Sequence, residues 1–157
     1  MIFRQLFEPE SSTYTYLIGC PESGAAVLVD PVLETAERDL AAVRELGLAL
    51  AWTVETHVHA DHVTGAARLR GLTGCKVAYP DGEEIAGADA RVGELAPLAV
   101  GSVTLRPLYT PGHTDNHHCY LAGDRVLTGD ALLIGGCGRT DFQGGCPATL
   151  YRSVHDK

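Results

Sequence analysis

The stretch Thr56-His57-Val58-His59-Ala60-Asp61-His62 decides the fold class. It follows the apolar run Leu48–Val54, which predicts a buried strand that ends in this loop. Three imidazoles and one carboxylate lie close together, and imidazole binds zinc, iron, copper and nickel. Side chains alternate along an extended loop, so His57 and His59 should project to the same side. We expect Asp61 and His62 to begin the following helix. A merely solvated loop is disfavoured, because it holds three of the chain's seven His.

Two later turns follow strand-like runs and carry further candidate ligands. In Thr110-Pro111-Gly112-His113-Thr114, Pro and Gly predict a sharp turn with His113 at its tip. Asp130 lies at the end of another apolar run, within Leu127-Thr128-Gly129-Asp130-Ala131. Either signal alone is weak, since an Asp at a strand end is commonly a turn residue or a helix cap. The His-rich loop strengthens the interpretation of His113 as a metal ligand.

The composition excludes several classes of protein. The length of 157 residues suits one domain over residues 1–157, and a net charge of −8 makes nucleic acid an improbable partner. Five Cys without a C-x-x-C pattern argue against disulfides and a zinc ribbon, and each is expected to be a small buried residue. No signal peptide or apolar run of about 20 residues is present, so we expect no membrane association and a cytoplasmic protein.

The remaining pattern alternates strands with helices and predicts an α/β protein whose sheets are covered by helices. Strands are expected at Thr13–Ile18, Ala25–Val29, Leu48–Val54, Cys75–Tyr79, Leu98–Val100, Val103–Tyr109, His118–Leu121 and Arg125–Thr128. Helices are expected at Ala36–Leu46 after a Thr35 cap, at His62–Leu72 and at Ala148–His155. Pro80–Gly93 is expected to be mostly loop, and Gly135–Gly145 a long loop.

The three motifs together resemble the metallo-β-lactamase superfamily. They are His57-x-His59-x-Asp61-His62, Pro111-Gly112-His113-Thr114 and Thr128-Gly129-Asp130. Further stretches resemble the persulfide dioxygenases, also called sulfur dioxygenases. They are Arg4–Pro9, Asp30–Thr35, and Asp130–Ile134 running into Gly136–Gln143. The last block is the most specific, and the resemblance covers essentially the whole chain.

The resemblance implies an αβ/βα sandwich with a metal at one edge, between two sheets. It implies one iron(II) per chain, held by His57, His113 and Asp130, with zinc as a substitute. Two His and one carboxylate also leave open positions, as non-haem iron oxygenases require. The implied reaction oxidises glutathione persulfide with O2 to sulfite and glutathione. Family members usually continue beyond the equivalent of Lys157, so we expect the fold and the substrate pocket to be incomplete at the C-terminus.

Other residues keep two interpretations each. His59, Asp61 and His62 either support the ligands by hydrogen bonds or hold a second metal. Arg139 and Asp141 are expected to brace the loop near the site, with attraction of an anionic substrate as a second role for Arg139. The chain departs from the family at Asp115–His118, where small residues are common. His117 and His118 are expected to be exposed or at a strand edge, with a role as alternative ligands left open.

Two rival functions remain at this point. One is a thioester hydrolase resembling glyoxalase II (hydroxyacylglutathione hydrolase), which uses two metals and a bridging hydroxide. The absent C-terminal His and the Gly136–Gln143 block disfavour it. The other is a non-catalytic metal-binding domain of a larger assembly. A homodimer is compatible with the sequence, and so is a rhodanese partner, because some relatives are fused to that sulfur-transferring domain.

Overall fold

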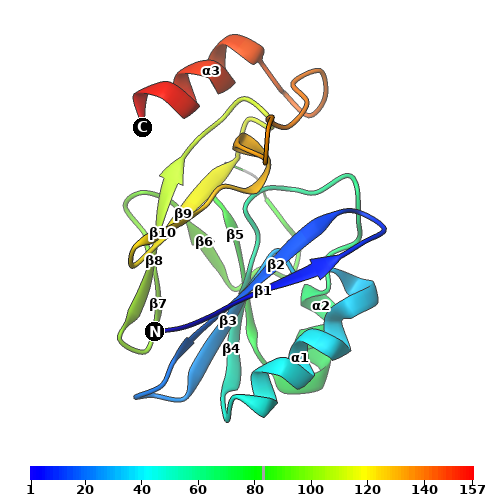
Figure 1. Cartoon of the computed structure of the whole chain (residues 1–157), viewed down its shortest axis with the longest axis vertical. Helices are drawn as coiled ribbons and strands as arrows, with labels where there is room; N and C mark the ends of the chain where they lie inside the picture. Colours follow the sequence, from blue (N-terminus) through cyan, green and yellow to red (C-terminus); the bar gives the residue numbers. More distant parts are fainter. Residues whose placement is uncertain (83) are drawn as a thin grey trace.

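Two β-sheets pack face to face in the computed structural model, which describes residues 1–82 and 84–157 (Figure 1). The first sheet has the order β1-β2-β3-β4-β5-β6 and the second the order β10-β9-β8-β7. The strands of the first sheet are Ile2–Glu8, Thr13–Cys20, Ala25–Val29, Ala49–Val54, Lys76–Pro80 and Ala90–Val92. Strands β7 to β10 are Leu98–Val100, Val103–Tyr109, His118–Ala122 and Arg125–Leu127. The helices are α1 (Ala36–Glu45), α2 (Ala66–Thr73) and α3 (Pro147–Asp156), with 3₁₀ turns η1 (Leu33–Thr35) and η2 (Gly129–Ala131).

The first sheet combines antiparallel hairpins with parallel crossovers. Strands β1, β2 and β3 pair antiparallel, while β3, β4, β5 and β6 run parallel. Parallel neighbours need a long connection, and α1 and α2 supply the first two. Both helices lie on the same side of this sheet, away from the second sheet (Figure 1). The second sheet is antiparallel throughout.

Strict alternation along β2 and β3 divides the apolar side chains between two cores. Ile18 and Val27 face the second sheet, where they pack with Leu105 and Tyr120. Their neighbours Leu17 and Leu28 face α1 and α2. Successive residues of a strand point to opposite faces, so a sheet buried on both sides needs continuous apolar runs. The two cores explain why the second half of β2 and the whole of β3 lack polar side chains.

Helix α3 lies at the end of the second sheet, on the face opposite the inter-sheet core (Figure 1). Its Leu150 is buried against Cys119 and Ala131. Helices α1 and α2 thus cover the outer face of the first sheet, and α3 packs at one end of the second sheet. The predicted αβ/βα sandwich is therefore confirmed.

Most of the expected elements are present, but the boundary of α2 was wrong. The helix begins at Ala66 rather than His62, because the preceding residues bond to another segment. Thr64 forms a β-bridge with Val32, and the N–H of Gly65 donates to the carbonyl of Pro31. Asp61 and His62 therefore belong to the loop and do not begin a helix.

The described residues of Pro80–Gly93 are mostly loop, as expected, with the short strand β6 inside the stretch; residue 83 lies outside the described residues. Two smaller points differ from the expectations. Strand β1 was not predicted, although its partner β2 was. Thr35 makes no side-chain cap for α1, since its hydroxyl donates to Val32 O and to Asp39 Oδ2. Among the described residues, no helix has the length and apolarity that a bilayer crossing needs.

The hydroxyl of Tyr120 joins the second sheet to the end of β4, beside the His-rich loop. Tyr120 of β9 is fully buried, and its phenol donates to the carbonyl of Glu55, just after β4, at 2.7 Å. We predict that Tyr120→Phe lowers the free energy of unfolding by about 1–3 kcal/mol, because a buried acceptor loses its donor. Denaturant unfolding measures the change, with Tyr151→Phe at a 65% exposed ring as the control. Equal stability of the two variants would contradict the prediction.

Candidate metal centre

The first candidate ligand, His57, lies three residues beyond β4 and is 1% exposed. Thr56 fixes the orientation of its ring. The Thr56 hydroxyl donates to Asp30 Oδ2 at 3.0 Å, because a carboxylate oxygen only accepts. The same oxygen lies 2.9 Å from His57 Nδ1 and must accept there, so Nδ1 carries the proton. His57 Nε2 then presents a lone pair, which is the form that binds a metal.

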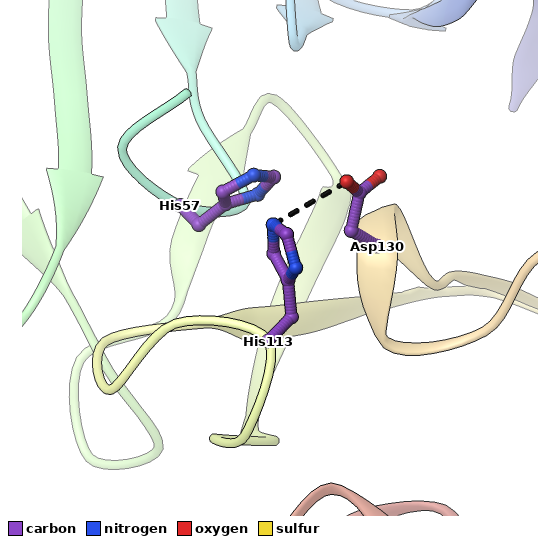
Figure 2. Close-up of side chains that lie close together, drawn as sticks. All are labelled: His57, His113 and Asp130. Carbon is purple, nitrogen blue, oxygen red and sulfur yellow. Dashed lines mark ion pairs between the residues drawn. The ribbon is translucent and has the colours of Figure 1, made fainter. Parts of the chain in front are cut away.

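His113 is oriented in the same way by a different partner. Its Nδ1 lies 2.7 Å from the carbonyl oxygen of Arg139 and donates to it, because a carbonyl only accepts. In the neutral ring, His113 Nε2 therefore carries the lone pair, and in the protonated ring it forms an ion pair with Asp130. It faces Asp130 Oδ2 at 3.3 Å, the contact drawn as a dashed line in Figure 2.

The three predicted residues His57, His113 and Asp130 converge on one point (Figure 2). One ligand atom from each lies within 4.8 Å of the others. Two imidazole lone pairs and a carboxylate facing one another repel unless a cation lies among them. Ligands about 2.1 Å from a metal ion lie roughly 3 Å apart, which agrees with the contact between His113 and Asp130. The donor set therefore fits a metal ion.

The point of convergence opens into a cleft of about 1060 Å³. Its walls include Phe7 and Tyr14 from the first hairpin, and Phe142 and Arg139 from the loop that follows η2. Asp130 retains 40% side-chain exposure, whereas His57 and His113 are buried. The open side of the triad thus faces a cleft that can admit a small-molecule substrate.

Comparison with known proteins identifies the family. A family model described as the metallo-beta-lactamase superfamily matches residues 9–157. A crystal structure of ETHE1 from Myxococcus xanthus is 51% identical, with a TM-score of 0.93 over 98% of this chain and 68% of that one. The chain belongs to the ETHE1 family of the metallo-beta-lactamase superfamily.

Two curated relatives mark the range of activities around this family. "Persulfide dioxygenase ETHE1, mitochondrial" from Mus musculus is 51% identical over all of this chain, which spans 63% of that protein's length. A hydroxyacylglutathione hydrolase from Rhodospirillum rubrum is 36% identical over 85% of this chain and 53% of its own length. The expectation that members of the dioxygenase family extend beyond this chain agrees with the first comparison.

His59, Asp61 and His62 form a second cluster whose ligand atoms also lie within 4.8 Å of one another. His59 Nε2 is held by Asp30 Oδ1 at 3.0 Å and lies 3.3 Å from Glu55 Oε2. His62 Nδ1 contacts Asp61 Oδ2 at 3.1 Å, and its Nε2 is buried with no hydrogen-bond partner among the described residues. Both predicted roles for this cluster, support of the ligands and a second metal, stay predictions.

Arg139 acts at the site through its backbone. Its side chain is 67% exposed and forms an ion pair with Asp141 at 2.8 Å, away from the three ligands. Its carbonyl accepts the Nδ1 proton of His113. The N–H of the preceding residue, Gly138, donates to Asp130 O at 2.7 Å. This loop thus contacts two of the candidate ligands through its backbone, and the bracing role of Arg139 and Asp141 stays a prediction.

The prediction for His117 and His118 was wrong, because both are buried, at 0% and 3% exposure. His117 stacks on His57, with ring centroids 5.1 Å apart, and its Nε2 accepts the N–H of Asp130 at 3.2 Å. The polar run Asp115-Asn116-His117-His118 contains no signal for this contact with the triad. His118 lies two residues before the inward-facing Tyr120 in β9. Because residues two apart in a strand share a face, this spacing could have indicated that His118 faces inward.

Burial and neighbouring charges shift the pKa values around the centre in opposite directions. Burial lowers the pKa of His57 and lowers that of His117 to about 3, so both rings are neutral. Burial raises the pKa of Asp130. Burial alone would lower the pKa of His59, but the carboxylates of Asp30 and Glu55 raise it well above the usual value.

Acid should destabilise the chelator-treated protein. His117 has a lowered pKa in the folded state, so the unfolded chain binds more protons as the pH falls from about 6.5 towards 3. Each such imidazole removes about 1.4 kcal/mol of stability per pH unit in that window. His59, whose pKa is raised, is protonated in both states below 6.5 and adds no slope.

Denaturant unfolding in EDTA at pH 7, 6 and 5 measures this dependence. In His117→Gln, the slope below pH 6 should be shallower than in the wild type by about one proton. Parallel slopes in the two proteins would show that His117 is not a neutral group in the folded state.

Proposed function

We propose that this protein is an iron(II)-dependent dioxygenase that oxidises glutathione persulfide with O2 to sulfite and glutathione. The observation that carries the proposal is the triad of His57, His113 and Asp130, with both imidazoles fixed as Nδ1–H tautomers. Two His and one carboxylate on one face are typical of non-haem iron(II) oxygenases. The identity to persulfide dioxygenases exceeds that to the hydrolases and extends over the whole chain, which favours the same activity.

The reaction balances without a further reductant. Glutathione persulfide, O2 and H2O give glutathione, sulfite and two protons, and the outer sulfur supplies all the electrons that reduce O2. A bound iron(II) would supply adjacent positions where a thiolate and O2 meet. The protein contributes the arrangement of the donors and the shape of the cleft. Both products and substrates are small enough for a cleft of this volume.

Several groups near the triad have a task in this proposal. Thr56 holds the proton of His57 at Nδ1, and Arg139 O does the same for His113. Phe7, Tyr14 and Phe142 offer apolar surface to the stem of the thiol, and Arg139 at the rim offers charge to a carboxylate. Gln143 donates to Val58 O at 3.1 Å and thereby fastens the loop of the cleft to the His-rich loop.

An oxygen electrode tests the proposal directly. Protein loaded anaerobically with iron(II) should consume O2 when it is given glutathione persulfide, and sulfite should form in equal amount. The same preparation should not hydrolyse S-lactoylglutathione. Binding of two zinc ions per chain, together with thioester hydrolysis and no O2 uptake, would overturn the proposal in favour of the hydrolase.

Metal removal should lower the stability of the fold. A ligand that binds only the folded state stabilises it by about 2.7 kcal/mol when present at 100 times its Kd. We therefore predict that iron(II) raises the Tm of chelator-treated protein and that EDTA reverses the rise. Calorimetry under nitrogen measures it, with magnesium as the control cation. A Tm that iron(II) does not change would contradict the proposed iron site. The cytoplasmic location, the homodimer and the rhodanese partner stay predictions from the sequence.

A further inference from the structure

His117 is a fully buried imidazole in contact with two of the three candidate ligands, and the proposed chemistry gives it no task. It lies between the turn that carries His113 and the strand β9. Its ring stacks on that of His57 at 5.1 Å, with 28° between the planes. The same ring meets that of His113 edge-on at 6.2 Å.

Both ring nitrogens of His117 are already engaged. Nε2 accepts the N–H of Asp130, so Nδ1 carries the proton. Nδ1 donates to Thr110 Oγ1 at 2.9 Å, and that hydroxyl donates in turn to Cys119 Sγ at 3.2 Å. A ring with both nitrogens occupied has no lone pair for a metal. The alternative that His117 is itself a ligand is therefore disfavoured.

The backbone beside this contact is closely packed. Gly129 has a φ of +46°, and a Cβ at this position would lie 2.7 Å from His117 Nε2 and 2.7 Å from Thr56 Oγ1. The residue before Asp130 thus lies close to both His117 and Thr56, whose hydroxyl orients His57. We therefore expect a change of the His117 ring to displace Asp130, His57 or both.

We propose that His117 is a positioning residue that sets the separation of His57 and Asp130 around the metal. The inference rests on the proposed metal site. One face of the ring supports His57, and its Nε2 fixes the backbone of Asp130. Groups that hydrogen-bond to metal ligands from outside the coordination sphere commonly change metal affinity by about 10–100-fold.

Two substitutions separate the functions of the ring. His117→Gln keeps an amide oxygen that can accept the N–H of Asp130 but removes the aromatic face. His117→Phe keeps a flat ring against His57 but removes the acceptor. The matched control is His118→Gln, since His118 is also buried but its Nδ1 bonds to Asn116 O and its ring meets Tyr109.

The measurement is iron(II) affinity under nitrogen, by competition with a chromophoric chelator, together with the unfolding free energy in EDTA. We expect His117→Phe to weaken iron(II) binding by about 10–100-fold. His117→Gln should recover part of that loss, and His118→Gln should bind iron as the wild type does. The absorption bands of bound cobalt(II) should shift in His117→Phe and not in His118→Gln, which a loss of stability alone would not produce.

The outcomes distinguish this inference from the proposed function. Equal iron affinity in wild type and His117→Phe would overturn the inference and leave the dioxygenase intact. Equal losses in His117→Phe and His118→Gln would also overturn it, because the effect would then be general destabilisation. A wild-type protein that binds no iron(II) would overturn the proposed function itself.

Discussion

Replacing His113 by alanine should reduce persulfide-dependent O2 uptake by a factor on the order of a thousand or more. The side chain supplies one of only two neutral nitrogen donors of the triad, and its Nε2 faces Asp130 at 3.3 Å. Metal ions typically contribute several kcal/mol to a reaction that they promote, and about 4 kcal/mol corresponds to three orders of magnitude. Without His113, one His and one exposed carboxylate remain, which is too few to retain iron(II).

Oxygen-electrode rates and bound iron are measured on the same preparation. His155→Ala is the matched control, because it makes the same chemical change on an exposed ring of α3. It should leave both quantities unchanged. A His113→Ala protein that keeps stoichiometric iron and a rate within about tenfold of the wild type would remove His113 from the centre.

The three candidate ligands could be predicted because each closely follows a strand, and two of them also follow a sharp turn. His57 comes after β4, His113 after β8 with Pro111 and Gly112 before it, and Asp130 after β10 with Gly129 before it. Strands are the part of a sequence that periodicity predicts best, and their ends meet along the edges of packed sheets. Local sequence therefore marked the three segments, and the choice of His57 within the His-rich loop rested on the resemblance to the dioxygenases.

The groups that orient the ligands could not be predicted in this way. Asp30 holds Thr56 by two hydrogen bonds, yet the two residues are 26 positions apart. The contact of His117 with His57 joins segments from different sheets. The delayed start of α2 has the same cause, since Thr64 pairs with Val32 rather than continuing a helix. Pairings between distant segments leave no local periodicity, and only the assembled fold reveals them.

Gly112→Ala should damage both the fold and the metal centre. Gly112 has a φ of +133°, and a Cβ there would lie 2.3 Å from the backbone nitrogen of Leu150. Two hydrogen bonds hold α3 on this turn. The N–H of Cys146 donates to Gly112 O, and the hydroxyl of Ser153 donates to Pro111 O. The substitution adds backbone strain to a steric clash that no side-chain movement relieves. We expect the free energy of unfolding to fall by about 2–6 kcal/mol.

The effect should also reach iron binding, because His113 follows Gly112 directly and moves with the turn. Denaturant unfolding and iron affinity are compared with those of Gly135→Ala, a Gly with a φ of +75° and no atom within 4 Å of the added Cβ. That control contains the backbone strain alone, of about 1–2 kcal/mol. If Gly112→Ala were no less stable than the control, the packing of α3 against the turn would not be needed to hold His113. A large loss of iron(II) affinity in Gly112→Ala, but not in Gly135→Ala, would show that α3 maintains the geometry of the metal centre, although it is far from the His-rich loop in sequence.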